Sequence, residues 1–259
     1  MAVLEARGVC KTFGGLAAVS DVDLDVAEGE IVGIIGPNGA GKTTFFNCLT
    51  GLEVPTGGSI TFQGAPLPSR PDAVTRAGVA RTFQNIRLFA NMTSLENVLV
   101  GGHTRIHAGV ASAIFRGPRY HREENKAEDR ARELLEFVGL GRIAGDLAKN
   151  LAYGDQRRLE IARALATEPA LLLLDEPTAG MNASETSSAV ELVRKIQAQG
   201  QAIVLIEHDM RFVFGLCDRV AVLVQGKKLT EGTPAEVQAD PRVIAAYLGE
   251  PTDDAKGAP

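Results

Sequence analysis

The sequence predicts an α/β protein built around a mostly parallel sheet, and two observations lead to this prediction. Short apolar runs at residues 31–35, 170–174, 202–206 and 220–224 have the length of strands that are buried on both faces. Each of the last three runs follows a segment with helical spacing of its apolar residues. Strands that alternate with helices are typical of a parallel sheet whose two faces are covered by helices.

The segments before and within this core have a different character. The chain up to about residue 90 is rich in short apolar alternations that indicate strands. Residues 91–155 are expected to be helical, with the clearest helix at 124–138 and Gly139 as its stop. We therefore expect one domain over residues 1–250, with a core of 1–90 and 156–250, a helical subdomain of about 91–155, and a flexible tail of 251–259.

Composition excludes several classes of protein. Of the 259 residues 45% are hydrophobic and 23% charged, which argues against disordered and fibrous chains. The net charge of −5 argues against binding nucleic acid through a broad basic face. No apolar stretch approaches the length of a membrane span, and the N-terminus lacks the pattern of a secretory signal. The cysteines Cys10, Cys48 and Cys217 lie too far apart for a zinc pair, so we expect reduced thiols in the cytosol.

Residues 36–43 read Gly-Pro-Asn-Gly-Ala-Gly-Lys-Thr and fit the phosphate-loop pattern G-x-x-x-x-G-K-[ST]. Glycines let successive backbone N–H groups turn toward one anion, and the helix that follows adds the positive end of its dipole. Lys42 is expected to reach the β- and γ-phosphates, and the Thr43 hydroxyl to hold Mg²⁺. We expect nucleotide contacts along the whole segment, from Gly36, Pro37, Asn38, Gly39, Ala40, Gly41, Lys42, Thr43 and Thr44.

The apolar run at 171–174 ends in two carboxylates, Asp175 and Glu176. A parallel strand delivers such residues at the carboxyl edge of the sheet, where ligands bind in open α/β folds. Asp175 could bind Mg²⁺, usually through a water, and Glu176 could polarise the attacking water as the general base. A lone carboxylate after a strand more often caps the next turn, but a phosphate loop upstream favours the catalytic interpretation.

Residues 151–158 read Leu-Ala-Tyr-Gly-Asp-Gln-Arg-Arg and resemble the signature segment of ABC-transporter ATPases. Further motifs follow in the order of that family. Phe13 stands where an aromatic ring stacks on adenine, Gln84 in the Q-loop, Asn182 in the D-loop, and His208 at the switch histidine. The resemblance spans nearly the whole chain. It implies a P-loop NTPase of the ABC cassette type, with a mostly parallel sheet core, an N-terminal antiparallel β part and an inserted α-helical subdomain.

Longer strings narrow the resemblance to one branch. LAYG-x-QRRLEIAR, AG-x-N-x-x-ET, LIEHDM and EGTP-x-EV look like the ATP-binding subunits of branched-chain amino acid importers. That branch implies a peripheral ATPase on the cytoplasmic face of the inner membrane. Its implied partners are a second ATPase subunit (identical or paralogous), two transmembrane permease subunits and, indirectly, a periplasmic solute-binding protein. Residues 87–118 would carry the permease-docking surface, in which Leu88, Phe89, Met92 and Leu95 are either contacts or core residues.

The resemblance also implies roles for single residues. ATP and Mg²⁺ would lie between two head-to-tail subunits, and the signature residues Ala152, Tyr153 and Gly154 would face the γ-phosphate of the partner's ATP. Gln84 would contact Mg²⁺ and the attacking water, which His208 would also contact. Phe13 would stack on adenine, or would otherwise be a core aromatic residue.

Four positions depart from the family pattern. Ala152 replaces a serine, Tyr153 a glycine, Asp155 a glutamine and Asn182 an aspartate. Backbone donors at the signature remain, so we expect ATP hydrolysis despite the lost hydroxyl group. The effect of the Asp155 carboxylate, which suits a helix start but could repel the γ-phosphate, stays open.

Other functions compete with this interpretation. A P-loop kinase or other phosphotransferase acting on a small molecule would need neither the segment 151–158 nor a dimer. An ABC protein of DNA repair or of the ribosome would carry a long coiled coil, zinc cysteines or a second cassette, and the sequence has none of these. Among importers, urea-like amides and aromatic acids stay open as the cargo.

Overall fold

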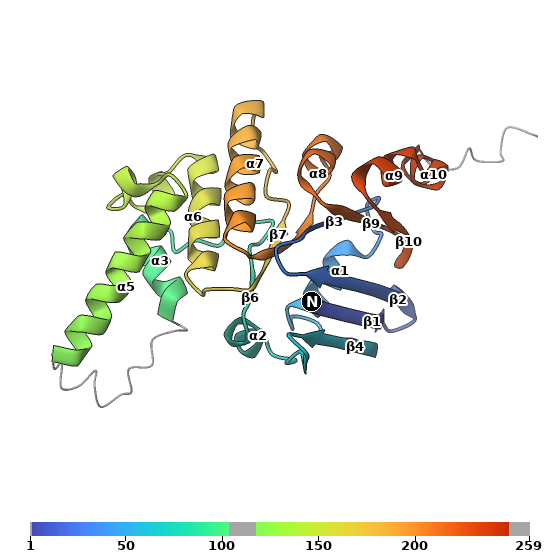
Figure 1. Cartoon of the computed structure of the whole chain (residues 1–259), viewed down its shortest axis with the longest axis horizontal. Coiled ribbons are helices and arrows are strands. Elements are labelled where there is room, and N and C mark those ends of the chain that lie inside the picture. The colour runs from blue at the N-terminus through green and yellow to red at the C-terminus, as the bar shows by residue number, and fades with distance from the viewer. Residues whose placement is uncertain (1, 104–117, 249–259) are drawn as a thin grey trace, which may run out of the picture.

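Two β-sheets organise the computed structural model, which describes residues 2–103 and 118–248 (Figure 1). The smaller sheet is antiparallel, with the strand order β2-β1-β4-β5. Its strands are β1 (Ala2–Phe13), β2 (Leu16–Ala27), β4 (Gly57–Phe62) and β5 (Ala65–Pro66). The antiparallel β part expected near the N-terminus is therefore present.

The larger sheet has the strand order β10-β9-β3-β8-β7-β6. Every neighbouring pair in it is parallel except β9 and β10, so the prediction of a mostly parallel sheet is confirmed. Its strands are β3 (Ile31–Ile35), β6 (Val79–Arg81), β7 (Leu171–Asp175), β8 (Ala202–Ile206), β9 (Arg219–Val224) and β10 (Lys227–Gly232). The four apolar runs of the sequence are β3, β7, β8 and β9.

The helices cover the larger sheet and extend beyond one of its edges (Figure 1). They are α1 (Lys42–Leu49), α2 (Pro71–Ala77), α3 (Ser94–Gly102), α5 (Pro118–Phe137), α6 (Tyr153–Leu165), α7 (Ala183–Ala198), α8 (Met210–Leu216), α9 (Pro234–Ala239) and α10 (Pro241–Leu248). Two short 3₁₀ turns, η2 (Gly141–Ile143) and η3 (Ala148–Asn150), precede α6. The helix expected at 124–138 is α5, which begins earlier, at Pro118.

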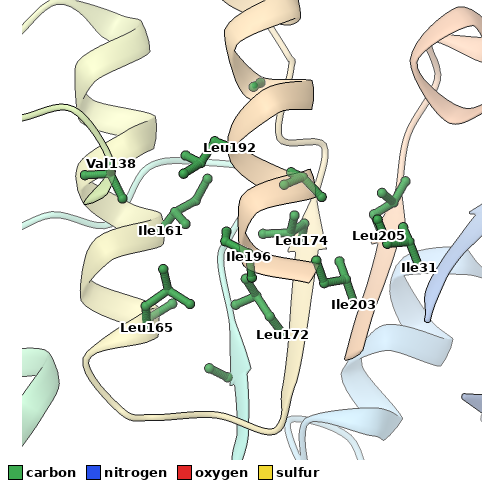
Figure 2. Close-up of a cluster of buried hydrophobic side chains, with 14 of the residues drawn as sticks. Ile31, Val138, Ile161, Leu165, Leu172, Leu174, Leu192, Ile196, Ile203 and Leu205 are labelled. Atoms are coloured by element: carbon green, nitrogen blue, oxygen red, sulfur yellow. The ribbon is translucent and has the colours of Figure 1, made fainter. Parts of the chain in front are cut away.

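Alternate residues of the parallel strands point into two different cores, as the two-residue period of a strand requires. Leu172 and Leu174 of β7 pack on the side of α6 and α7 (Figure 2). Leu171 and Leu173 point the other way, into a second core that contains Phe45 of α1 and the inner face of the smaller sheet. Burial of each such leucine stabilises the fold by about 1.5–3 kcal/mol. Helix α1 is thus fixed between the two sheets, which holds the loop before it in place.

The parallel strands β3, β7 and β8 run in the same direction and in close register. Ile34 pairs with Ile206, and Ile206 pairs with Asp175. The residues that follow these strands therefore gather at one edge of the larger sheet.

Helices α3 and α5 lie beyond α6 and away from the smaller sheet (Figure 1). They share a core with α6 through Val98, Leu135 and Leu159. The proposed division of the chain at residues 91 and 155 stays a prediction, and the predicted tail of 251–259 lies outside the described residues. Within residues 2–103 and 118–248, no helix has both the length and the apolar character needed to span a bilayer.

Candidate active site

The loop between β3 and α1 is shaped by glycines that have no room for a side chain. Gly36 and Gly41 have φ angles of 147° and 93°, in the region that favours glycine. A Cβ at Gly36 would collide with the carbonyl oxygen of Leu223, and one at Gly41 with that of Ala18. The backbones of β9 and β2 therefore close over the loop and fix its shape.

Lys42 is the first residue of α1, and its ammonium group folds back into the loop. The residue is 6% exposed, and its Nζ donates hydrogen bonds to the carbonyl oxygens of Gly36 (2.7 Å) and Pro37 (3.0 Å). Burial lowers the pKa of Lys42 from its ordinary value, although the charge of Glu176 acts in the opposite direction. The ammonium group and the amino end of α1 together place positive charge at one point, as a phosphate site requires.

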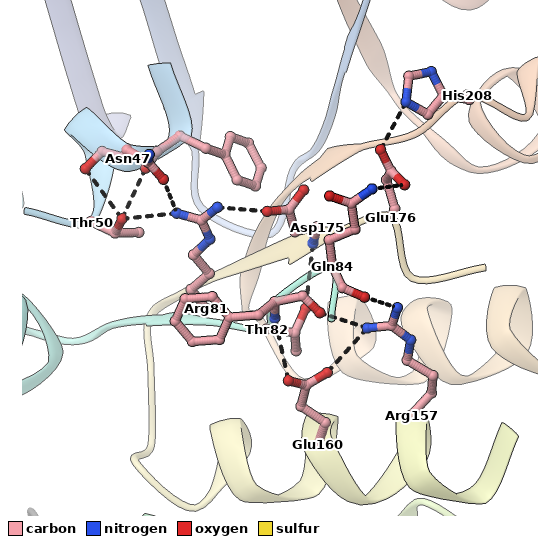
Figure 3. Close-up of polar contacts among 12 residues, drawn as sticks. Asn47, Thr50, Arg81, Thr82, Gln84, Arg157, Glu160, Asp175, Glu176 and His208 are labelled. Carbon is pink, nitrogen blue, oxygen red and sulfur yellow. Dashed lines mark hydrogen bonds and ion pairs between the residues drawn. The ribbon is translucent and has the colours of Figure 1, made fainter. Parts of the chain in front are cut away.

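Glu176 follows β7 and meets two of the other predicted residues. Its backbone has a φ of 49°, and its N–H donates to the carbonyl oxygen of Ile206 at 2.9 Å. The carboxylate Oε2 accepts a hydrogen bond from Nε2 of Gln84 at 2.8 Å, and Oε1 lies 2.8 Å from Nε2 of His208 (Figure 3). A carboxylate, an amide and an imidazole from three separate segments thus meet at the carboxyl edge of the sheet.

Asp175, one residue earlier, is buried and ion-paired. It is 4% exposed, and its Oδ2 lies 2.5 Å from Nη2 of Arg81 at the end of β6. Arg81 also donates to Oδ1 of Asn47 (2.7 Å) and to the hydroxyl oxygen of Thr50 (3.3 Å), so it ties Asp175 to the far end of α1 (Figure 3). No role was expected for Arg81, because its partner Asp175 lies 94 residues further along the chain.

A pocket of 570 Å³ brings most of the predicted residues together. Its wall contains the loop residues 38–44 together with Gln84, Glu176 and His208. Gly36 and Pro37 do not line it and instead supply the carbonyl groups that hold Lys42. A second pocket, of 360 Å³, lies between α3 and α5 and contains none of the predicted residues.

The pocket wall also contains residues that the sequence did not predict, namely Leu16, Ala17, Ala18, Gln225 and Gly226. Phe13, the predicted adenine platform, is not among the lining residues. It is 45% exposed at the end of β1, and Nζ of Lys11 lies 4.9 Å from the centre of its ring. The start of β2 lies beside the loop before α1, although the two segments are separate in the sequence. No local sequence pattern predicts this contact.

The signature residues at the start of α6 lie outside this pocket. Ala152 occupies the N-cap position of α6 without a side-chain hydrogen bond and is exposed together with Tyr153. Gly154 is buried next to the side chain of Glu185. Asn182 caps α7 and accepts hydrogen bonds from two backbone N–H groups of that helix. Within one chain, the start of α6 and the loop before α1 are therefore separate surfaces.

The segment after Gln84 divides into buried and exposed residues. Leu88 and Leu95 pack against the core that lies under α6, whereas Phe89 and Met92 are 46% and 36% exposed. Of the predicted docking segment, residues 104–117 lie outside the described part of the chain.

Comparison with known families gives two matches. A family described as "ABC transporter" matches residues 19–179, and one described as "Branched-chain amino acid ATP-binding cassette transporter" matches residues 227–253. The chain is 50% identical over 250 residues to the high-affinity branched-chain amino acid transport ATP-binding protein LivG of Salmonella typhimurium. That alignment covers 96% of this chain and 98% of LivG.

Solved structures of two cassettes resemble the fold. One is a nucleotide-free ATP-binding cassette from an ABC transporter, with a TM-score of 0.84, 30% identity, and coverage of 96% of this chain and 100% of that one. The other is a dimeric ATP-binding cassette in a post-hydrolysis state, bound to ADP and Pi. Its TM-score is 0.75 at 26% identity, and the match covers 89% of this chain and 98% of that one.

Proposed function

This chain belongs to the ABC transporter family, and on that premise we propose that it is the ATP-hydrolysing subunit of an importer of branched-chain amino acids. The proposal of ATP hydrolysis rests on the position of Glu176. Its carboxylate lies between Gln84 and His208, at the pocket that the loop residues 38–44 line. The match at residues 227–253 and the name of LivG support branched-chain amino acids as the cargo.

The geometry suggests how the chain would hydrolyse ATP. Lys42 would exchange its bonds to loop carbonyls for bonds to the β- and γ-phosphates, and backbone N–H groups at the start of α1 would take the remaining phosphate oxygens. Glu176 would accept the proton of the attacking water as the general base. The amide of Gln84 and the imidazole of His208, which both contact that carboxylate, would orient the water.

The oxygen donors near the loop fit Mg²⁺. This cation binds one or two carboxylates together with phosphates and waters. Thr43 lines the pocket with a hydroxyl oxygen, whereas the carboxylate of Asp175 is buried directly before Glu176 and does not itself line the pocket. Because Arg81 pairs with the Asp175 carboxylate, we expect that carboxylate to act through a water, with Gln84 as a further oxygen donor. No described group of three or more His, Cys, Asp or Glu side chains could hold a metal, so the phosphates themselves would supply several contacts. Bound Mg²⁺ neutralises charge that develops on the phosphates.

The exposed start of α6 supports a head-to-tail dimer. Ala152 and Tyr153 face solvent and lie outside the pocket of their own chain, so they are free to meet the ATP of a second cassette. The dimeric cassette bound to ADP and Pi is a precedent for such an assembly. Arg158 lies 3.5 Å from Asp155 and offsets part of the negative charge that Asp155 adds there.

We place the chain on the cytoplasmic face of the inner membrane, bound to two transmembrane permease subunits that receive cargo from a periplasmic solute-binding protein. The exposed Phe89 and Met92 are the proposed permease contacts, because they are apolar side chains that the fold leaves uncovered beside the Q-loop. Leu88 and Leu95, the other two candidates, are partly buried and pack against the core.

Uptake by cells that lack this chain tests the proposed cargo. Labelled leucine, isoleucine and valine should enter more slowly, and the loss should be restored by the wild-type chain but not by Glu176→Gln. Urea and an aromatic acid serve as the competing cargoes. Reduced uptake of either of these, with unchanged uptake of leucine, would contradict the proposal.

The sequence left a phosphotransferase open as an alternative, and the dependence of turnover on protein concentration separates it from the proposed ATPase. ATP turnover per chain should rise steeply with concentration if two chains form each site, whereas a monomeric phosphotransferase would give a constant value. The comparison needs only purified protein and a phosphate-release assay.

A further inference from the structure

Two buried charged residues of α6 hold the backbone of the Q-loop. Arg157 and Glu160 lie one turn apart and are 3% and 1% exposed. Arg157 donates hydrogen bonds to the carbonyl oxygens of Phe83 (2.6 Å) and Gln84. The carboxylate of Glu160 accepts from the backbone N–H groups of Phe83 and Arg87, both at 3.4 Å, and pairs with Arg157 at 3.2 Å.

These contacts replace the hydrogen bonds that a regular element would supply. The segment after β6 forms no helix or strand up to α3, so its backbone groups must find partners elsewhere. Burying a guanidinium and a carboxylate costs free energy that hydrogen bonds must offset, and Nε of Arg157 is buried without a partner. Here the hydrogen bonds from Arg157 and Glu160 to the loop offset this cost. Because both residues belong to α6, the position of this helix sets the path of the backbone at Gln84.

The same arginine reaches the exposed start of its own helix. Nη2 of Arg157 donates to the hydroxyl oxygen of Tyr153 at 3.1 Å, and the guanidinium lies 5.6 Å from the centre of that ring. The edge of the ring also packs against Gly180, where an added Cβ would lie 3.3 Å from a ring carbon. A displacement of Tyr153 would therefore move Arg157 and the carbonyl groups that it holds.

On the other side of the loop, the side chain of Gln84 donates to Glu176 at 2.8 Å. A continuous set of contacts thus runs from Tyr153 through Arg157 and Gln84 to the carboxylate, and Figure 3 shows Gln84 between Arg157 and Glu176.

We propose that Arg157 and Glu160 are positioning residues that couple the exposed start of α6 to Gln84 and so to Glu176. In the head-to-tail dimer of the proposed function, on which this inference rests, the start of α6 meets the partner's ATP. Binding of that ATP then changes the positions of Gln84 and Glu176 in the chain's own hydrolytic site, so the two ATP sites are coupled. Such coupling is reciprocal and is typically 5- to 150-fold in affinity.

Four variants of the full-length chain test this coupling: Arg157→Gln, Glu160→Gln, the double variant, and Arg132→Gln as the control. The double variant leaves no unpaired charge in the core, so it keeps the test valid if either single variant fails to fold. Arg132 forms an exposed ion pair with Glu128 on α5, so its loss removes the same charge away from the loop. ATP hydrolysis as a function of ATP concentration gives kcat, KM and the Hill coefficient, and thermal unfolding gives the stability of each variant.

In wild type and in Arg132→Gln we expect cooperative hydrolysis. In the double variant the Hill coefficient should fall to about 1 because the coupling is lost. The kcat should fall about tenfold because Gln84 and Glu176 are less well positioned. The variant should still unfold cooperatively on heating and should bind ATP as a single chain with the wild-type affinity. Wild-type kcat and cooperativity in a folded double variant would overturn the proposed coupling but not the proposed dimer. A wild-type chain whose turnover is non-cooperative and independent of protein concentration would overturn the dimer as well.

Discussion

The loop before α1 and the start of α6 both lead into helices and both contain glycine, but they are built differently. In the loop, Gly36, Gly39 and Gly41 all have positive φ angles, and Lys42 fills its centre. At the start of α6, Gly154 is the only glycine, and its neighbours Ala152 and Tyr153 face solvent. The first surface is a closed cradle, whereas the second is an open helix end.

This difference indicates which part each surface would play in binding the phosphates of ATP. A cradle with converging N–H groups and a buried ammonium group can hold a phosphate by itself. An open helix end offers a few donors from one side, so it can add to a phosphate site but cannot enclose one. A single chain should therefore bind ATP through the loop and should need a second chain to complete the site.

The largest effect is expected from Glu176→Gln, which tests both surfaces together. Removal of a general base lowers the rate by about 10²–10⁴, while the loop and α6 stay intact. Bound ATP should then persist and hold two chains together, which phosphate release and size-exclusion chromatography with and without ATP would measure. A chain that stays monomeric with ATP bound would contradict these two roles, because the start of α6 would then have no partner site.

Lys42→Met should act on the first surface alone. Methionine preserves much of the volume but removes the buried charge, and loss of such a contact to a developing charge costs about 10²–10³ in rate. Binding of a fluorescent ATP analogue to the single chain should be lost with it. Analogue binding at the wild-type affinity would show that the loop does not depend on its ammonium group.

Tyr153→Ala should act at the start of α6 and leave the loop before α1 intact. It removes the hydroxyl group that accepts from Arg157, a hydrogen bond worth about 0.5–3 kcal/mol depending on charge, and it uncovers Gly180. We expect unchanged binding of the ATP analogue to the single chain, with a weaker ATP-dependent dimer in the Glu176→Gln background. Analytical ultracentrifugation measures the second quantity, and an unchanged dimer constant would argue against a role for this helix end.

The smallest effect is expected in the rate at which the cysteine thiols react, which reports how tightly α1 is packed behind the loop. Burial raises the pKa of the Cys48 thiol to about 11 and that of Cys217 to about 12. Since only the thiolate reacts, both should react slowly with a disulfide reagent at pH 8, whereas the half-buried Cys10 should react first. Mass spectrometry of labelled peptides, with urea-unfolded protein as the control, follows each site; fast labelling of Cys48 would indicate that α1 opens.

Several site residues could be predicted because their signals are local. The loop at 36–44 and the pair Asp175 and Glu176 each lie directly after a buried strand, and the topology of a parallel sheet brings the ends of such strands together. Arg81 and Leu16 could not be predicted in this way. Each acts through a segment that is distant in sequence, and no spacing rule connects those segments.

The elements, the order of the motifs and the kind of chemistry follow from the sequence, because glycine geometry, strand periodicity and carboxylate placement are properties of short segments. The side-chain contacts between these segments depend on the tertiary structure. It placed Glu176 between Gln84 and His208, and it left the start of α6 outside the pocket of its own chain. The physical reason is that these contacts depend on how α6 and the strands pack against one another, and packing is set by whole surfaces rather than by any single motif.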